Sequence, residues 1–447
     1  MSEYIIAIEL GSSKVVGIAG YRDENGQLVV SAIEKESATN IIKRGCIQNV
    51  DEVFSLVNKI KTKLENRLSP AKITKVYVGV GGVSVSAEEK ITKRSFHEDS
   101  VIKQAHVQRL KEECRAMLPN TVDVLEIVPN GYIIDGRAER NAIGVTGTTI
   151  EAHYKAITAK PVLRRNIDRC FIERTKLPIA GYITGALATA DVVLSKEERM
   201  LGCMLVDFGA ETTTVSIYKN DTLVLLETLP MGGRNITRDI MSLNLISSEA
   251  EQLKITSGIA KGFKSEFNQR LKFEGDNMVE IDLAKLTSVV EARSEEIVAN
   301  VDEQIKRAGL ERKDLTAGVI VIGGAAKLRG WIELLEERFV GMKVRVGVLR
   351  KDIQAVEKES SQINDYIQAV GLLYAAKDDC TKTPANSAVE VERPQPVVVV
   401  PEEDDEEEII TITPEKHEEK PKRRSIFSSF FDKFGKMIEE GESEDEN

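Results

Sequence analysis

Short apolar runs separated by polar turn residues open the chain. The runs YIIAIEL (4–10), KVVGIAG (14–20) and QLVVSAI (27–33) have the length and the β-branched content of strands. Gly-Ser-Ser separates the first two runs and Asn25-Gly26 separates the next two, which predicts a tight turn at both places. Apolar positions then recur at helical spacing from Val53 to Leu64.

The same plan returns in the middle of the chain. The runs CMLVDFG (203–209), TTVSIYK (213–219) and TLVLLETL (222–229) predict three further strands, and Gly232-Gly233 precedes another helical segment. Two copies of one strand–turn–strand–strand–helix unit indicate two similar α/β halves that face each other.

The rest of the body completes these halves and adds two insertions. The predicted organisation is a first lobe at 1–83 and 161–202 with a connecting helix near 365–376, an insertion at 84–160, a second lobe at 203–235 and 316–364, and a helical subdomain at 236–315. In the first insertion we expect a helix at 100–117 and strands at 122–128, 131–134 and 149–157. In the helical subdomain we expect helices at 249–263 and 285–308.

Composition narrows the class of protein. The chain has 447 residues, is 42% hydrophobic and carries a formal net charge of −11. From Lys377 onward Lys and Arg number 10 and Asp and Glu number 21, so this tail accounts for the whole net charge and the body is neutral. A neutral body gives no reason to expect a nucleic-acid partner.

Five cysteines without ligand spacing and four scattered histidines argue against a metal site made of His and Cys. The N-terminus lacks the basic region of a signal peptide, and no apolar run is long enough to span a bilayer. We therefore expect a cytoplasmic protein.

The chain changes character at residue 377. Half of its twelve prolines and the acidic run Glu402–Glu408 fall within 377–421, which is typical of a disordered linker. Residues 422–440 then follow the pattern of an amphipathic helix, and 441–447 form an acidic tail. The residues expected to contact a membrane are Arg423, Arg424, Ile426, Phe427, Phe430, Phe431, Phe434, Met437 and Ile438.

Aromatic residues on one helix face with cations at its rim suit an anionic lipid surface. A helix that docks on the body or on a protein partner is the alternative. Because the segment is short and includes Gly435, it needs an apolar surface on which to fold.

Three loops at the ends of predicted strands carry residues that suit a nucleotide. Gly11–Lys14 offers backbone N–H groups, two hydroxyls and an amine to phosphate, behind a Glu9 carboxylate that suits hydrated Mg²⁺. Asp207–Thr213 repeats this order of acid, glycine and hydroxyls, and Gly323-Gly324 ends a buried strand at 319–322. Each loop alone is typical of an ordinary turn, but the three in this order favour a nucleotide cleft between the lobes.

These segments resemble known motifs. IAIELGSSKV, LVDFGAETTTV, IVIGGAAKLRG and DYIQAVGLLYAA look like the two phosphate motifs, the adenosine motif and the second connecting helix of the actin, Hsp70 and sugar-kinase superfamily, and residues 185–198 fit its first connecting helix. KRGCIQNVDE, YVGVGG, PMGGRNITRDI and SEAEQLKITSG are similar to the FtsA family of bacterial cell division. The resemblance covers about residues 4–376 and implies a two-lobed, actin-like ATPase fold.

The resemblance also implies roles for individual residues. The nucleotide-binding residues would be Gly11, Ser12, Ser13, Lys14, Gly209, Ala210, Thr212, Thr213, Gly232, Gly233, Glu251, Lys254, Gly323, Gly324 and Ala325. Glu9 and Asp207 would position Mg²⁺ through water. By their spacing alone, Glu251 and Lys254 would more often form a surface ion pair.

The second phosphate loop departs from the family pattern. Such proteins usually read Gly-Gly-Gly-Thr-Thr-Asp there, whereas residues 209–214 read Gly-Ala-Glu-Thr-Thr-Thr. Glu211 would repel a triphosphate unless it points outward or helps to hold Mg²⁺, and Thr214 replaces an acid that could position water. We therefore expect ATP binding with slow or negligible hydrolysis, and we identify no catalytic base.

The resemblance implies partners and a location. An FtsA-like protein polymerises with ATP and anchors the tubulin-like FtsZ ring to the cytoplasmic side of the inner membrane at mid-cell, as a peripheral membrane protein. Residues 84–160 would serve self-assembly and other division proteins, and 236–315 would bind the acidic C-terminal peptide of the ring protein. The candidate cations for that peptide are Arg234, Arg238, Lys306, Arg307 and Arg312.

Two alternatives share the fold. A PilM-like protein of type IV pilus assembly ordinarily lacks a terminal amphipathic helix. A sugar or acetate kinase would need an acidic base beside a polar substrate pocket and no lipid anchor. An Hsp70-type chaperone is not expected, since no β-rich peptide-binding domain follows residue 376.

Overall fold

The computed structural model describes residues 3–262, 270–274 and 278–382. The predicted amphipathic helix, the acidic tail and nearly all of the predicted linker lie outside the described residues. The predicted start of the linker at 377 is too early, because β21 (Thr381–Lys382) pairs with β6 (Lys72–Ile73). Just before it, the Cys380 N–H donates to the Tyr4 carbonyl at 2.8 Å. The body therefore extends to residue 382.

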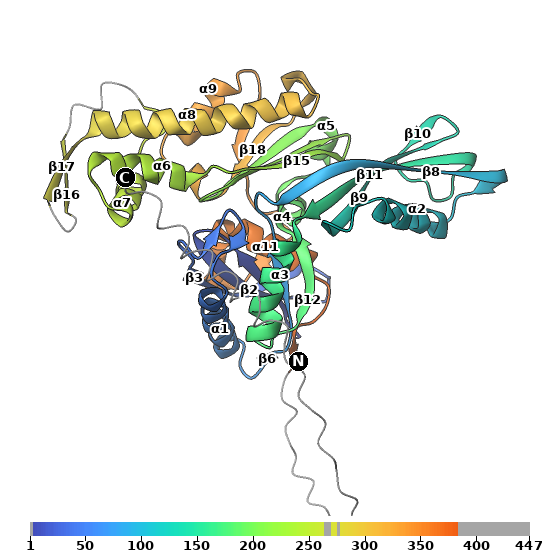
Figure 1. Ribbon diagram of the computed structural model, residues 1–447, viewed down its shortest axis with the longest axis horizontal. Coiled ribbons are helices and arrows are strands. Elements are labelled where there is room, and N and C mark those ends of the chain that lie inside the picture. Colours follow the sequence, from blue (N-terminus) through green and yellow to red (C-terminus); the bar gives the residue numbers. More distant parts are fainter. Residues whose placement is uncertain (1–2, 263–269, 275–277, 383–447) are drawn as a thin grey trace, which may run out of the picture. The chain divides into compact units, whose positions relative to one another are not determined.

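The first lobe contains a six-stranded sheet (Figure 1). Its strands, in spatial order, are β12 (Ile179–Thr184), β7 (Val76–Val80), β1 (Ile5–Leu10), β2 (Lys14–Arg22), β3 (Leu28–Ser37) and β20 (Gln354–Ala355). The predicted second-lobe segment 316–364 therefore ends too late, since β20 pairs with β3. Smaller elements of this lobe are β4 (Ile42–Lys43), β5 (Cys46–Ile47), α3 (Pro161–Asp168) and α10 (Glu357–Ser360).

Helices cover both faces of this sheet. A Cβ at Gly17 would meet Ile60 of α1 (Val50–Arg67), whereas a Cβ at Gly20 would meet Leu373 of α11 (Ile367–Ala375). Burial on both faces explains why β1 and β2 read as continuous apolar runs and not as alternating ones.

The second lobe repeats the plan of the first. Its five strands, in spatial order, are β15 (Thr222–Leu229), β14 (Thr213–Lys219), β13 (Cys203–Phe208), β18 (Gly318–Ile322) and β19 (Val344–Val346). The antiparallel β13–β14 pair matches β1–β2, and the parallel β13–β18 pair matches β1–β7. The prediction of two similar α/β halves is confirmed.

The predicted connecting helix at 185–198 is two helices, α4 (Gly185–Val193) and α5 (Lys196–Leu201). At the break the Glu198 N–H donates to Ser195 Oγ at 3.1 Å, and the Ser195 N–H donates to the Glu198 carboxylate at 2.9 Å. This reciprocal cap starts a new helix within a pattern that reads as continuous.

In its described residues, the helical subdomain of the second lobe contains three main helices and a hairpin, seen along the top of Figure 1. They are α6 (Gly233–Ile240), α7 (Ser247–Ser257), α8 (Leu283–Arg307), and β16 (Arg270–Glu274) paired with β17 (Met278–Asp282); α9 (Trp331–Arg338) packs on α8. Helix α7 ends before the predicted residue 263, because Gly258 turns the chain into a bridge between Ile259 and Arg329. Helix α8 agrees with its prediction within two residues.

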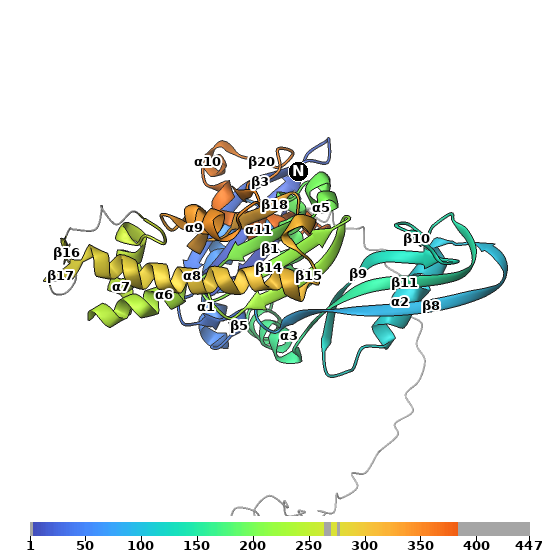
Figure 2. The same ribbon diagram turned by 90° about the horizontal axis from the view of Figure 1, so that it is seen from above.

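The insertion has its own sheet and projects sideways in Figures 1 and 2. The order is β10 (Arg137–Glu139), β9 (Asp123–Ile134), β11 (Thr146–Ala159) and β8 (Val85–Val101), with α2 (Gln104–Ala116) packed on it. Sequence reasoning misses β8 because this edge strand is rich in charged residues. It also divides β9 in two and starts the helix inside β8. Strands β8 and β9 contact β15 of the second lobe.

None of the helices in the described part of the chain is long and apolar enough to cross a membrane.

Candidate functional site

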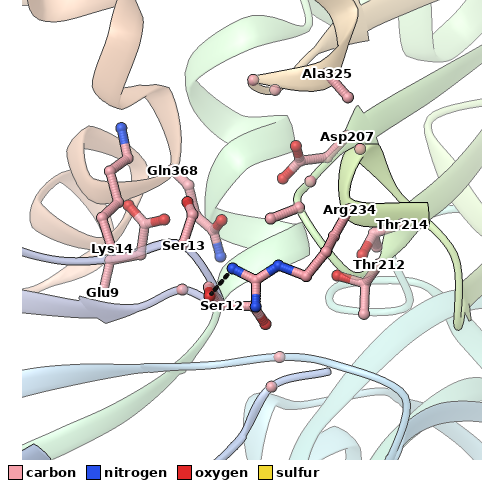
Figure 3. Close-up of a pocket in the computed structure, with 18 of the residues that line it drawn as sticks. Glu9, Ser12, Ser13, Lys14, Asp207, Thr212, Thr214, Arg234, Ala325 and Gln368 are labelled. Carbon is pink, nitrogen blue, oxygen red and sulfur yellow. Dashed lines mark hydrogen bonds between the residues drawn. The ribbon is translucent and has the colours of Figure 1, made fainter. Parts of the chain in front are cut away.

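A cavity of about 1210 Å³ lies between the two lobes, and Figure 3 shows part of its lining. Its walls come from the ends of β1 and β13, the turns after them, α6, α7, the segment after β18 and the start of α11. Of the predicted site residues, those in the lining are Glu9, Gly11, Ser12, Ser13, Lys14, Asp207, Gly209, Ala210, Thr212, Gly233, Glu251, Lys254, Gly323, Gly324 and Ala325.

Two turns of the same geometry enter the cavity from opposite lobes. After β1 the Gly11 N–H donates to the Lys14 carbonyl at 3.1 Å, and after β13 the Gly209 N–H donates to the Thr212 carbonyl at 2.9 Å. A Cβ at Gly11 or Gly209 would lie 2.8 or 2.9 Å from that same carbonyl oxygen. Glycine therefore keeps both turns tight, and the turns carry their hydroxyl residues to the cavity.

Two predicted nucleotide contacts, Thr213 and Gly232, do not line the cavity. The Thr213 side chain is fully buried and donates to the Met231 carbonyl at 2.9 Å, while Thr212 and Thr214 face the cavity. Successive side chains of β14 point to opposite faces, so only alternate residues reach the ligand side. Gly232 packs against the second turn, since a Cβ there would lie 2.5 Å from the Gly209 carbonyl oxygen.

The carboxylates of Glu9 and Asp207 stand at equivalent strand ends and line the cavity (Figure 3). Burial raises the pKa of Glu9 to about 7, with Asp207 adding to the shift and Lys14 opposing it. Burial likewise raises the pKa of Asp207 to about 6, again opposed by Lys14. A bound cation would favour the ionised forms of both carboxyl groups and so offset the cost that burial places on their ionisation.

Glu251 and Lys254 form an ion pair in the cavity wall. Lys254 Nζ lies 2.7 Å from Glu251 Oε2 and also donates to the Gly233 carbonyl at 3.1 Å and to Thr237 Oγ1 at 2.9 Å. The Lys254 side chain is only 11% exposed, and this burial lowers its pKa. The pair thus joins α7 to the start of α6.

The glycines after β18 have different tasks. Gly323 has φ +96° and a Cβ there would lie 2.4 Å from the Phe208 carbonyl oxygen, so the backbone approach requires glycine. A Cβ at Gly324 would meet nothing within 4 Å and would point into free space. Gly324 therefore leaves room in the cavity, whereas Gly323 allows its backbone to lie close to that of Phe208 at the end of β13.

Lys14 lines the cavity without pointing at the turn that carries it. Its ammonium lies 4.4 Å from the centre of the Tyr366 ring and donates to the Asp365 carbonyl at 3.4 Å. Lys327 of the second lobe pairs with the Asp365 carboxylate at 2.5 Å. Sequence reasoning missed Asp365 and Tyr366 as cavity residues, although they lie in the segment 365–376 that it identified, just before α11 begins at Ile367.

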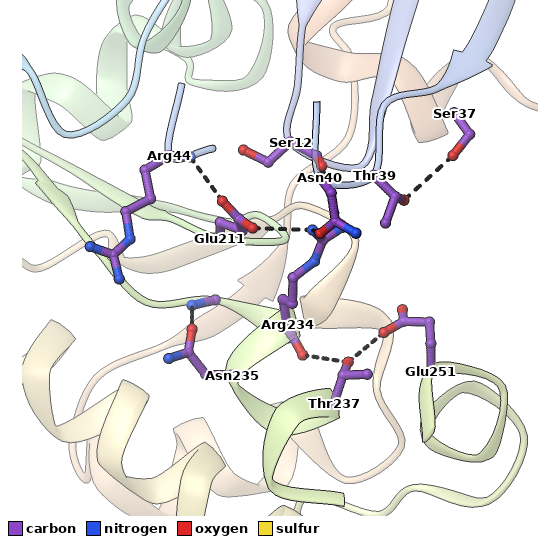
Figure 4. Close-up of polar contacts among 12 residues, drawn as sticks. Ser12, Ser37, Thr39, Asn40, Arg44, Glu211, Arg234, Asn235, Thr237 and Glu251 are labelled. Carbon is purple, nitrogen blue, oxygen red and sulfur yellow. Dashed lines mark hydrogen bonds and ion pairs between the residues drawn. The ribbon is translucent and has the colours of Figure 1, made fainter. Parts of the chain in front are cut away.

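Glu211 does not enter the cavity lining, although it lies in the second phosphate loop (Figure 4). Its carboxylate accepts from the Arg44 N–H of the first lobe at 2.9 Å and from Arg234 Nη1 at 3.1 Å. The expected repulsion of a phosphate is thus reduced by an adjacent guanidinium.

The assignment of Arg234 to the peptide of the ring protein is wrong in its location, because Arg234 lines the cavity and not an outer surface. The other cations predicted to bind the ring-protein peptide do lie outside the cavity. Arg238 is exposed, Lys306 is 77% exposed beside Glu303, and Arg307 and Arg312 are 58% and 40% exposed.

Among the described residues no group of three or more potential metal ligands occurs. Two cavity carboxylates without further protein ligands fit a Mg²⁺ ion that keeps most of its water.

Comparison with known proteins gives two matching family models. One, described as cell division protein FtsA, matches residues 204–371, and the other, described as the SHS2 domain inserted in FtsA, matches residues 82–158. The second match coincides with the sheet of β8–β11.

Relatives named cell division protein FtsA are similar over most of the chain. The protein of Porphyromonas gingivalis is 33% identical over 386 residues, which are 85% of this chain and 80% of the relative. The protein of Bacillus subtilis is 26% identical over 386 residues, 84% of each chain. Among solved structures, the PilM–PilN type IV pilus biogenesis complex has a TM-score of 0.57 at 14% identity and covers 83% of this chain and 97% of its own; this likeness shows a shared fold alone.

The raised pKa of Glu9 predicts how the stability of the ligand-free protein depends on pH. Between its ordinary value of 4.5 and about 7, Glu9 is protonated in the folded chain but ionised in the unfolded chain. Stability therefore falls as pH rises through this window, by about 2–3 kcal/mol from this residue. In Glu9→Gln this loss is absent, so the variant gains on the wild type by that amount between pH 5 and pH 8, measured by urea unfolding with EDTA.

Asp207→Asn provides the matched comparison. The gain in unfolding free energy of Asp207→Asn over the wild type grows between pH 3.8 and about 6. This gain is complete at a lower pH than the gain of Glu9→Gln. If the unfolding free energies of Glu9→Gln and the wild type differ by a constant amount across the whole pH range, the claim that burial raises the pKa of Glu9 is contradicted.

Proposed function

The chain belongs to the FtsA family of actin-like cell-division proteins, and from this premise we propose what it binds and where it works. It binds ATP with Mg²⁺ in the cavity between the lobes. It assembles with further copies of itself, and it anchors the tubulin-like FtsZ ring to the inner face of the cytoplasmic membrane at the division site.

The observation that carries the nucleotide proposal is the pair of equivalent glycine turns that enter one cavity from opposite lobes. Backbone N–H groups and hydroxyls of Gly11–Lys14 and Gly209–Thr212 would bind phosphates, while the segment Gly323–Ala325 would border the adenosine. Glu251 and Lys254 would lie against the ribose or base. Glu9 and Asp207 would hold a hydrated Mg²⁺, which supplies charge neutralisation for the phosphates.

Turnover is expected to be slow. Thr214 stands in the lining where related loops carry an acid, and its hydroxyl lies 3.3 Å from that of Thr228. Of the acids in the lining, Glu9 and Asp207 are assigned to the cation, so neither is assigned as a base for water.

Residues 422–440 anchor the body to the membrane in this proposal. Support comes from the apolar arc that includes Phe427, Phe430 and Phe434 and from the cations Arg423 and Arg424. The helical subdomain at 236–315 would bind the ring protein, and 84–160 would contact other copies and other division proteins. The PilM-like alternative rests on a likeness at 14% identity. A kinase role is not favoured, because each acid among the described lining residues has another assignment: Glu9 and Asp207 to the cation, and Glu251 and Asp365 to ion pairs with Lys254 and Lys327.

Gly324→Asp tests the nucleotide site. The new side chain points into free space in the cavity, so the protein folds, but its carboxylate repels a nucleotide. We expect ATP affinity to fall at least about tenfold in calorimetry, since one like charge at close range costs 1.4 kcal/mol or more.

Gly324→Ala is the matched control, because it adds the Cβ without the charge. It should bind ATP within about threefold of the wild type, a difference below 1 kcal/mol. Unchanged ATP affinity in Gly324→Asp removes the assignment of the cavity.

Anchoring is tested with vesicles of phosphatidylethanolamine and phosphatidylglycerol, purified FtsZ and ATP. The full chain should carry FtsZ into the vesicle pellet, whereas Phe430→Glu/Phe434→Glu should leave both proteins in the supernatant. Losing two buried aromatic side chains costs about 3 kcal/mol or more, comparable to the affinity of a short interfacial helix.

Ser428→Glu/Ser429→Glu adds the same charges outside the apolar arc and should still sediment with the vesicles. If the double phenylalanine variant sediments as the wild type does, the anchor lies elsewhere. If it is released yet ATP binding is intact, the two parts of the proposal act independently.

A further inference from the structure

The guanidinium of Arg234 reaches from the second lobe to the first (Figures 3 and 4). Its Nη1 donates to Glu211 Oε1 at 3.1 Å and to Asn40 Oδ1 at 3.2 Å, and its Nη2 donates to the Ser12 carbonyl at 3.4 Å. The side chain is 17% exposed, so this charge is largely enclosed while still lining the cavity.

The backbone of Arg234 is fixed to the second phosphate loop. The Arg234 N–H donates to the Ala210 carbonyl at 2.7 Å, and the preceding Gly233 N–H donates to the Gly209 carbonyl at 3.0 Å. The start of α6 is therefore attached to this loop, so the backbone from which the guanidinium extends has a defined position.

Glu211 fixes the direction of the guanidinium. Its side chain is only 9% exposed and is held from the other side by the Arg44 N–H at 2.9 Å. A carboxylate this enclosed needs both partners, because leaving an enclosed charge unpaired is costly. The Glu211–Arg234 pair thus withstands exchange with solvent better than a surface ion pair would.

The contact with Ser12 is of a different kind. It is long, and its acceptor is a neutral carbonyl, whereas guanidinium groups bind phosphate oxygens more strongly and often through two N–H groups. In Figure 3 the guanidinium lies beside Ser12 of the first turn, while the Arg234 N–H donates to Ala210 of the second turn. An anion bridging the two turns would therefore meet it directly.

We propose that Arg234 is a ligand of the terminal phosphate of the bound nucleotide and that Glu211 is the residue that positions it. The inference rests on the proposed nucleotide site and deepens it. Because Arg234 contacts both turns, it meets the phosphate that bridges them, which lies furthest along the nucleotide from Gly323–Ala325. The side chain consequently distinguishes a triphosphate from a diphosphate.

The test measures affinities of the full chain for a non-hydrolysable ATP analogue and for ADP, both with Mg²⁺, by calorimetry. Arg234→Ala should weaken binding of the ATP analogue at least about tenfold and binding of ADP less than about threefold. In Arg234→Lys the affinity for the ATP analogue should lie between that of the wild type and that of Arg234→Ala, because lysine keeps the charge but not the paired donors. Glu211→Gln should reduce the preference for the triphosphate in the same direction.

Arg293→Ala is the matched control. Arg293 Nε of α8 pairs with Asp239 of α6 at 2.5 Å, so the variant breaks a second arginine–carboxylate pair that involves α6 but lies outside the cavity lining. Both affinities should stay within about twofold of the wild type.

The outcomes separate this inference from the proposed function. The inference is overturned if Arg234→Ala weakens binding of the ATP analogue and of ADP equally. It is also overturned if Arg293→Ala lowers the two affinities as Arg234→Ala does. In either case Arg234 only connects the two lobes structurally. A wild type that binds neither nucleotide removes the proposed nucleotide site itself. If Arg234→Ala does not fold, as judged by thermal unfolding, the affinity ratio of Arg234→Lys decides.

Discussion

Each lobe brings one acid to the cavity by closing a strand-to-strand turn on a glycine, and the site depends on that closure. The two antiparallel pairs have the same register, in which Glu9 lies opposite Val16 and Asp207 opposite Thr214. The carboxylates therefore stand at equivalent strand ends, close enough for Asp207 to raise the pKa of Glu9. Burial makes the ionisation of these two acids unfavourable, and binding a cation would relieve that cost.

Contacts across the cavity involve the same segments that would bind a ligand. Glu211 of the second lobe accepts from the Arg44 N–H of the first, Arg234 reaches the Ser12 carbonyl, and Lys327 pairs with Asp365. A nucleotide that competes for any of these groups would change how the lobes are joined. Nucleotide binding would thus be coupled to the relation between the lobes through side chains and not only through the connecting helices.

Much of the fold could be predicted because its strongest signals are local. Strands β1, β2, β13 and β14 are continuous apolar runs ended by glycine turns, and the repeat of that unit revealed the two lobes. Strands β20 and β21 have two residues each and carry no pattern, so their pairing depends on tertiary context. Strand β8 was missed because its charged residues hide a strand that packs on one face.

The site shows the same division between local and distant information. The choice between Thr213 and Thr214 was available from the alternation of β14, since Val215 and Ile217 mark the buried face that Thr213 shares. The pairing of Glu211 with Arg234 joins residues 23 positions apart, and the Arg44 N–H comes from the other lobe. Nothing in the local pattern indicates these contacts. The sequence therefore predicts that Glu211 repels phosphate, whereas in the fold the adjacent Arg234 guanidinium reduces that repulsion.

Hydrogen exchange with and without Mg²⁺ and ATP tests the central claim most directly. If one nucleotide bridges the two lobes, peptides that cover residues 9–16 and 207–214 should both gain protection at the same ATP concentration. Protection should rise much less in the insertion sheet, whose strands β9–β11 lie outside the cavity lining. Protection of only one of the two turns, or of neither at a saturating ATP concentration, would contradict a nucleotide site shared by both lobes.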